Sequence, residues 1–185
     1  LLTLISFLGY LGCADLLYKE KEPIHLWGES YSIDKTTRLI LSGNELSGPI
    51  PPEIGNLINL TILDLRNNQL SEDIPAEIGN LINLTILDLR DNQLTGTIPN
   101  EIGNLINLTT LDLSKNQLTG IIPNEICNQG DASPELGDNQ LCSPYPVCIE
   151  EGTGSQDTSN CPIELWGNLY PIEDTCLLYT SPSPR

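Results

Sequence analysis

Residues 57–80 read LINLTILDLRNNQLSEDIPAEIGN, and the next 24 residues, 81–104, read LINLTILDLRDNQLTGTIPNEIGN. These two copies differ at only five of 24 positions. A third copy, LINLTTLDLSKNQLTGIIPNEICN, occupies 105–128, a diverged copy precedes them at 33–56, and a shortened fifth, ASPELGDNQL, ends at residue 141. Self-similarity at a fixed period of this length indicates a solenoid, in which each unit stacks on its neighbours.

The spacing of apolar residues within one copy predicts the path of each coil. Leu63 and Leu65 have the period of two of a short strand, and the Ile-Pro-x-x-Ile-Gly segment cannot continue it because Pro lacks an amide donor. The chain must turn back there, so that stacked coils about 4.8 Å apart form a parallel sheet over a shared core. The residues expected inside one coil are Leu57, Leu60, Leu63, Leu65, Asn68, Leu70, Ile74 and Ile78.

An asparagine recurs where each expected strand ends. Its amide offers two donors and an acceptor, enough to satisfy the turn backbone of its own and neighbouring coils. We therefore expect a structural role, which we call the Asn ladder. Its members are Asn44, Asn68, Asn92, Asn116 and Asn139.

The pattern LxxLxxLxLxxNxLxGxIPxxIGx resembles the plant-type leucine-rich repeat, an extracellular class found in receptor-like kinases, polygalacturonase inhibitors and some exported microbial proteins. The match spans 33–148. It implies a curved α/β solenoid with a parallel sheet on the concave side and short 3-10 or irregular segments on the convex side. It also implies ligand binding on the concave face, without catalysis. Glu72 stands where other copies have Gly, so either a positive φ is not required there or this coil is locally distorted.

The outward strand positions are the candidate binding surface, because exposed columns on a solenoid are its usual contact surface. Arg38, Ile40 and Ser42 occupy these positions in the first coil. Three aspartates one strand apart form a like-charge column that needs compensation, and Arg66 and Arg90 are the candidates to supply it. A merely solvated surface is the alternative. The candidate partner-binding residues are Ile62, Asp64, Arg66, Asn67, Ile86, Asp88, Arg90, Asp91, Thr110, Asp112, Ser114 and Lys115.

Composition excludes several function classes. The chain has 185 residues, 25 acidic against 8 basic, and a net charge of -17, so it offers no basic patch for nucleic acid or an anionic membrane. We expect a protein, peptide or glycan partner, and membrane contact only through a lipid anchor or a missing span. With one His and no catalytic or phosphate-binding motif, we expect no enzyme activity, no metal and no cofactor.

Four cysteines lie near the end of the repeats. Residues 141–148 (LCSPYPVC) resemble the Leu-Cys-x-Pro cap of the family, which favours a Cys142–Cys148 disulfide and leaves Cys127 for Cys161. The rival pairing joins Cys127 to Cys148, which are nearly one coil apart. Four cysteines allow three connectivities, and the sequence does not choose among them. No neighbouring His or C-x-x-C motif supports zinc.

Both ends of the chain carry segments that we exclude from the folded domain. Residues 1–12 form an apolar run typical of a secretory signal, and Cys13 follows it as in a lipobox, so Cys13 is a candidate for lipidation. Residues 176–185 (CLLYTSPSPR) match the in-frame translation of a transposase sequencing adapter, with a genuine Ser/Pro-rich tail as the alternative. No Met is present, so we interpret the chain as a fragment of a longer reading frame.

The N-terminal cap is expected to be repeated. Trp27-Gly28 resembles the family's N-terminal cap, without its cysteine, so aromatic burial must do more of the covering. After a polar linker at 150–160, PIELWGNLYPI at 162–172 matches PIHLWGESYSI at 23–33 in seven of eleven positions. A second N-terminal cap therefore begins there. The expected divisions are 1–14 signal, 15–32 cap, 33–141 repeats, 142–161 C-terminal cap and linker, 162–175 second cap, and 176–185 adapter.

Taken together, the residues predict an exported binding module, secreted or at the cell surface, that recognises its partner on the concave face. One alternative is the ectodomain of a receptor-like kinase. Another is a structural protein, such as an adhesin, or an inhibitor of wall-degrading enzymes. The motifs Asn59-Leu-Thr61, Asn83-Leu-Thr85 and Asn107-Leu-Thr109 are glycosylation sequons in a eukaryotic host and repeat consensus otherwise.

Overall fold

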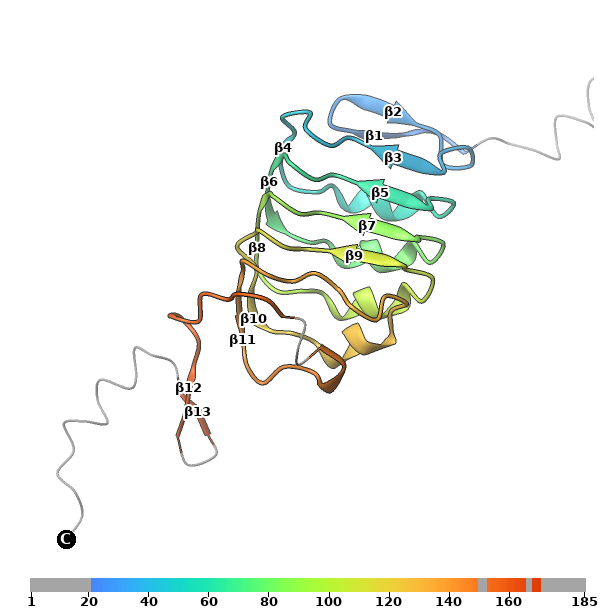
Figure 1. Cartoon of the computed structure of the whole chain (residues 1–185). Coiled ribbons are helices and arrows are strands. Elements are labelled where there is room, and N and C mark those ends of the chain that lie inside the picture. Colours follow the sequence, from blue (N-terminus) through green and yellow to red (C-terminus); the bar gives the residue numbers. More distant parts are fainter. Residues whose placement is uncertain (1–20, 150–152, 166–167, 171–185) are drawn as a thin grey trace, which may run out of the picture.

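A computed structural model describes residues 21–149, 153–165 and 168–170 (Figure 1). The chain winds into stacked coils, and each coil places one short strand beside the strand of the coil before it. These strands pair in parallel with every leucine in register, so that Leu39, Leu63, Leu87 and Leu111 form one row. The sheet runs in the order β3 (Arg38–Ile40), β5 (Ile62–Asp64), β7 (Ile86–Asp88) and β9 (Thr110–Asp112).

A second row of strands follows the first in each coil, and the sequence analysis did not predict it. Its strands pair in parallel as β4-β6-β8 and as β10-β11. They lie at or next to the position occupied by glycine in most coils, where alternation of apolar residues is absent. Their bounds are β4 (Ser47–Gly48), β6 (Gln69–Asp73), β8 (Gln93–Thr95), β10 (Thr119–Ile121) and β11 (Gln140–Cys142).

Short 3-10 helices return the chain on the side away from the first sheet. In the four longer ones, proline in extended conformation precedes the first turn, where its fixed φ and missing amide donor are tolerated. Stacking is tight: a Cβ at Gly79 would lie 2.5 Å from the Cβ of Glu101 in the next coil. The helices are η1 (Pro52–Asn56), η2 (Ala76–Asn80), η3 (Asn100–Asn104), η4 (Asn124–Asn128) and η5 (Val147–Ile149).

One continuous core runs through the stack, as the repeat predicts. In the second coil Leu57, Leu60, Leu63, Leu65, Leu70 and Ile78 are fully buried, and Ile74 is 3% exposed. No coil encloses its own apolar side chains, because the leucines of neighbouring coils pack on one another. The curved leucine-rich repeat solenoid expected from the sequence is confirmed.

Glu72 keeps the backbone shape of the glycines it replaces. Its φ is +66°, close to the +68° of Gly96 and the +78° of Gly120. The position therefore requires a positive φ in this coil as well, and the idea that it does not is wrong. A side chain other than Gly in this region costs about 1 kcal/mol.

The N-terminal end of the core is covered by a hairpin of β1 (Ile24–Leu26) and β2 (Glu29–Tyr31). Trp27 and Gly28 form its turn, with φ values of +47° and +87°. Leu26 is fully buried and Ile24 is 9% exposed, whereas Trp27 and Tyr31 are only partly buried against the core. Aliphatic side chains therefore do most of the covering that we expected from the aromatic ones.

The stack ends in a sixth rung that the sequence analysis took for linker. Residue Gln156 pairs with Asn139 as a parallel bridge, and its side chain repeats the bonding of the Asn ladder. Its Oε1 accepts a bond from the Leu141 amide at 3.0 Å, and its Nε2 donates to the carbonyls of Leu136 at 2.8 Å and Thr153 at 2.7 Å. The linker expectation is therefore wrong for residues 153–157.

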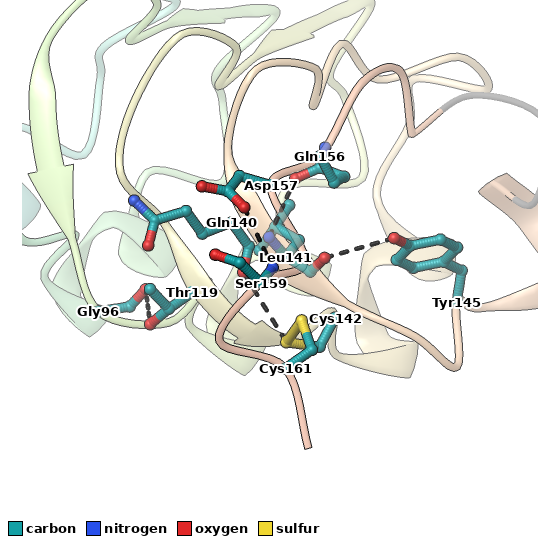
Figure 2. Close-up of a disulfide and its surroundings, with 10 residues drawn as sticks. All are labelled: Gly96, Thr119, Gln140, Leu141, Cys142, Tyr145, Gln156, Asp157, Ser159 and Cys161. Atoms are coloured by element: carbon teal, nitrogen blue, oxygen red, sulfur yellow. Dashed lines mark hydrogen bonds between the residues drawn. A yellow bond between two sulfur atoms is a disulfide. The ribbon is translucent and has the colours of Figure 1, made fainter. Parts of the chain in front are cut away.

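Two disulfides fasten this end, joining Cys127 to Cys148 and Cys142 to Cys161. The expected Cys142–Cys148 bond is wrong, and the rival pairing of Cys127 with Cys148 is the one formed. Cys127 occupies the glycine position of η4, and Cys148 lies in η5. Figure 2 shows the other bond beneath Leu141, whose carbonyl accepts a bond from the Tyr145 hydroxyl.

A second hairpin, β12 (Ile163–Leu165) and β13 (Asn168–Tyr170), follows the last rung and lies clear of the stack in Figure 1. In the part of the chain that the structure describes, no helix has the length and apolar character needed to cross a membrane. The expected signal segment at 1–14 with Cys13, residues 171–175 of the expected second cap and the expected adapter segment at 176–185 lie outside the described residues.

Candidate functional site

The outward side of the first sheet, which we call the concave face, presents two columns of side chains. Strand register places Arg38, Ile62, Ile86 and Thr110 in one column, and Ile40, Asp64, Asp88 and Asp112 in the other. Ile40 is 49% exposed, and Ile62 and Ile86 are half-buried, so these three form an isoleucine patch. Thr110 is exposed beyond the patch.

The aspartate column is compensated by the two arginines beside it, and we call the five residues the Asp–Arg ladder. Arg66 places Nε 3.5 Å from Asp64 Oδ1 and Nη1 3.6 Å from Asp88 Oδ2. Arg90 places Nε 3.8 Å from Asp88 Oδ2 and Nη1 3.3 Å from Asp112 Oδ2. Each guanidinium therefore joins two rungs, and each gap between neighbouring aspartates holds one positive charge.

Each aspartate also satisfies the backbone where its strand ends. The Oδ1 atoms of Asp64, Asp88 and Asp112 accept bonds from the amides two residues later, at 3.3, 3.2 and 3.0 Å. The Ser114 hydroxyl donates to Asp112 Oδ1 at 2.6 Å. These carboxylates therefore stabilise the backbone at the strand ends, in addition to contributing negative charge to the ladder.

Exposure differs sharply between the two kinds of charge. Asp88 and Asp112 are each 7% exposed, whereas the side chains of Arg66 and Arg90 are 38% and 41% exposed. The accessible charge of the ladder is therefore the outer edge of the guanidiniums. A partner that reaches the ladder itself meets the guanidinium donors of Arg66 and Arg90 before it meets the carboxylates of Asp88 and Asp112.

Burial shapes the acid–base behaviour of the ladder. It raises the pKa of the Asp88 carboxyl, an effect opposed by the Arg90 amide and guanidinium and reinforced by Asp112 and Asp64. The negative charge of Asp88 in turn raises the pKa of Arg90. Arg90 therefore stays a cation throughout the usable pH range.

Three exposed residues, Asn67, Asp91 and Lys115, rim the concave face just beyond the ladder. All have positive φ, at +55°, +57° and +54°, which turns each away from the strand that precedes it. They border a shallow hollow of about 470 Å³, to which Arg90, Asp112 and Ser114 also contribute. The structure thus gathers six of the predicted site residues around one depression.

Glu135 also lines this hollow, and the sequence analysis missed it. It pairs with Asp112 as a parallel bridge and so takes the aspartate position in the shortened fifth coil. The signal was present, because Glu135 lies four residues before Asn139 as Asp112 lies four before Asn116. Alignment on the ladder asparagine would have found it.

From Asn68 onward the Asn ladder faces inward and takes no part in the concave face. The Asn92 amide donates to the carbonyls of Leu65 and Leu89 at 3.0 Å each, and its Oδ1 accepts from the Leu70 amide at 3.1 Å. Asn68, Asn116 and Asn139 bond in the same way. Asn44 has no earlier coil to bond to, and its exposed side chain donates only to Ser42.

The sequon asparagines also bond between coils. Asn83 and Asn107 donate to the carbonyls of Ile58 and Ile82, each at 2.8 Å, and Asn59 donates to that of Asp34 at 3.1 Å. Their amides therefore hold neighbouring coils together. Among the described residues, no three His, Cys, Asp or Glu side chains are grouped as they would be around a metal ion.

Comparison with known families and structures identifies the fold's relatives. A leucine-rich repeat family model matches residues 58–118, and a second matches 35–57. No curated protein sequence matches the chain.

Solved structures give closer relatives. The ectodomain of the receptor kinase SOBIR1 from Arabidopsis thaliana is 34% identical, over 72% of this chain and 74% of that one, with a TM-score of 0.59. The GASSHO1/SCHENGEN3 ectodomain from Arabidopsis thaliana, in complex with CASPARIAN STRIP INTEGRITY FACTOR 2, is 42% identical over 57% of this chain, with a TM-score of 0.55. The Arabidopsis receptor kinase HAESA, in complex with the peptide hormone IDA and the co-receptor SERK1, is 37% identical over 64% of this chain, with a TM-score of 0.57.

The chain spans only 13% of the GASSHO1 structure and 20% of the HAESA structure, but nearly three quarters of SOBIR1. Its described coils share with these ectodomains the repeat pattern from which the stack is built. The chain therefore belongs to the leucine-rich repeat family, and its repeats are of the plant type.

Proposed function

We propose that this chain is the binding module of an exported protein, and that its concave face holds a protein or peptide partner. The observation that carries the proposal is the juxtaposition of the isoleucine patch with the half-exposed guanidiniums of Arg66 and Arg90. An apolar surface beside oriented donors suits a segment that offers apolar side chains and carbonyl or carboxylate groups. No catalytic role is assigned to any residue.

The comparisons support a protein or peptide in preference to a glycan. HAESA is described in complex with a peptide hormone and a co-receptor, and its repeats are similar to those of this chain. The isoleucine patch is apolar and carries no aromatic ring, whereas an interface with protein uses apolar anchors surrounded by polar groups. Secretion or cell-surface display fits the two disulfides, which persist in oxidising compartments.

Selection of a random peptide library on the immobilised chain tests this function. We expect enriched peptides whose affinity falls about tenfold or more in an Arg66→Ala/Arg90→Ala variant and in Ile62→Ser. Glu77→Ala/Glu101→Ala, on the exposed convex helices η2 and η3, is the matched control and leaves affinity within about twofold. Peptides that bind all concave variants as tightly as the parent, or that lose affinity only in the convex control, would contradict the proposal.

A second candidate is the ectodomain of a receptor-like kinase, because the similar structures include receptor-kinase ectodomains. It makes a separate prediction about the gene. The continuous reading frame from the native transcript would encode a membrane span followed by kinase motifs. A frame that instead encodes further repeats without either feature would exclude it.

A further inference from the structure

The β12–β13 hairpin repeats the β1–β2 hairpin in backbone as well as in sequence. In the first, Ile24 pairs with Tyr31, His25 with Ser30 and Leu26 with Glu29. In the second, Ile163 pairs with Tyr170, Glu164 with Leu169 and Leu165 with Asn168. Every pair is shifted by the same number of residues, so register and loop length are both preserved. The Trp-Gly dipeptide also stands between the strands in both copies of the sequence.

The first hairpin covers the N-terminal end of the hydrophobic core. Leu26 is fully buried and Ile24 is 9% exposed, and both belong to the core that runs on into the first coil. Figure 1 shows this hairpin beside β3, at the end of the stack. The hairpin thus supplies one apolar side that is stable only against a coil of repeats.

The second hairpin carries the same residues at the matching positions, Ile163 and Leu165, but follows a stack that is already closed. The sixth rung, with Gln156 bonded to Leu136 and Leu141, ends the first array before this hairpin begins. In Figure 1 the strands β12 and β13 lie clear of the stack. No coil of the first array therefore plays the part that β3 plays for the first hairpin.

We infer that the β12–β13 hairpin is the N-terminal cap of a second leucine-rich repeat array, and that its partner is the first coil of that array. The disulfide between Cys142 and Cys161 determines where this array starts. Cys142 ends β11 in the first array, and only Pro162 separates Cys161 from β12. The second array is therefore tied at its base to the last coils of the first, without a free linker between them.

Transplanting the second hairpin's sequence into the first position tests whether it is a cap. Four substitutions suffice, because the remaining seven of eleven residues are already shared. Thermal unfolding of the variant is expected within about 3 °C of the parent, since two of the replaced side chains, His25 and Ser30, are exposed and bond to each other. The substitutions are His25→Glu, Glu29→Asn, Ser30→Leu and Ser32→Pro.

Two controls keep this test decisive. Adding Leu26→Asp to the transplant is expected to lower the unfolding temperature by about 10 °C or more, because it places a charge in the core. A transplant that leaves Ser32 in place separates any local effect of proline from the capping role. If both transplants are destabilised as much as the Leu26→Asp control, the second hairpin is not a cap and the inference fails.

The substitution Leu165→Asp, made in the second hairpin of the otherwise unchanged chain, tests which part of the protein this hairpin packs against. It should leave the unfolding temperature of the first array unchanged, within about 2 °C, because that array is complete without the hairpin. A fall matching that of Leu26→Asp would assign the hairpin to the first array. A dimer in sedimentation that Leu165→Asp converts to monomer would assign it to a second copy of this chain. Either result overturns the inference.

Discussion

The stack contains two polar columns with the same spacing and opposite character. The Asn ladder is neutral and, from Asn68 onward, inward, and each of these members satisfies backbone groups of its own coil and of the preceding one. The Asp–Arg ladder is charged and outward, and its aspartates are stable side by side only because Arg66 and Arg90 alternate with them. Stacked repeats place identical side chains next to one another. Neutral amides can form such a column without repulsion, whereas neighbouring carboxylates repel and need a counterion.

The largest expected effect comes from breaking the inward column at its middle. Asn116→Leu leaves the buried Leu94 amide without its partner and removes one of the two asparagine donors from each of the carbonyls of Leu89 and Leu113. We expect a loss of about 4 kcal/mol in the free energy of unfolding, measured by urea titration. Asn44→Leu is the matched control, since its exposed side chain serves only Ser42, and it should cost less than about 1 kcal/mol. Equal losses at both positions would show that neighbouring coils do not matter to the column.

Breaking the outward column should cost less. The double variant Arg66→Gln/Arg90→Gln leaves three stacked carboxylates without counterions, and we expect a loss of about 1–2 kcal/mol in the free energy of unfolding. Because the arginines are partly exposed, about 1 M salt should reduce the difference from the parent. A difference that is unchanged by salt would mean that packing of the arginine stems, and not charge, is what was lost.

A third column consists of Gly48, Glu72, Gly96 and Gly120, which all have positive φ. Here the repeat fixes the backbone conformation, although one coil carries a residue that does not favour it. Glu72→Gly places the residue found at Gly48, Gly96 and Gly120 into a backbone of φ +66°. We expect a gain of about 1 kcal/mol in the free energy of unfolding, because glycine adopts this conformation without strain. The neighbouring substitution Ser71→Gly, where no positive φ is required, should lower stability slightly. A loss in Glu72→Gly would show that the carboxylate itself stabilises this coil.

The smallest effect is a difference in pH dependence between the parent and Asp88→Asn. Burial raises the pKa of Asp88 above its ordinary value of 3.8, so the folded state favours the protonated form. This stabilisation is fully present below pH 3.8 and is lost as pH rises through the raised pKa. Unfolding curves from acid to neutral pH should therefore show Asp88→Asn gaining stability relative to the parent as pH rises. A relative loss over that range would mean that the arginines dominate over burial.

The repeat predicted the features that depend on spacing alone. Buried leucines, the Asn ladder positions and the outward columns all follow from the 24-residue period, because in-register stacking gives equivalent residues equivalent surroundings. The end of the stack follows different rules. Gln156 lies 17 residues after Asn139 and replaces a shorter amide, so neither spacing nor residue type marked it as a rung.

The sequence offered the Cys127–Cys148 pairing as one alternative, but the choice among pairings and the second row of strands lay beyond it for a related reason. Pairing of Cys142 with Cys161 depends on how residues 153–157 return to the stack, which is visible only once the sixth rung exists. The strands of the second row are mostly two or three residues long and lie at or next to the position of glycine or Glu72, with no alternation to reveal them. At the concave face, the sequence identified the charges but not which of them are buried.

A reciprocal exchange of isosteric side chains tests the central claim, that the inward column holds the fold and the outward column is largely free for binding. Asn92→Asp places a carboxylate against the Leu65 and Leu89 carbonyls, whereas in Asp88→Asn the amide oxygen still accepts from the Arg90 amide. In urea titration at neutral pH, we expect Asn92→Asp to lose about 3 kcal/mol or more and Asp88→Asn to change by less than about 1 kcal/mol. Equal losses, or a larger loss in Asp88→Asn, would contradict the account.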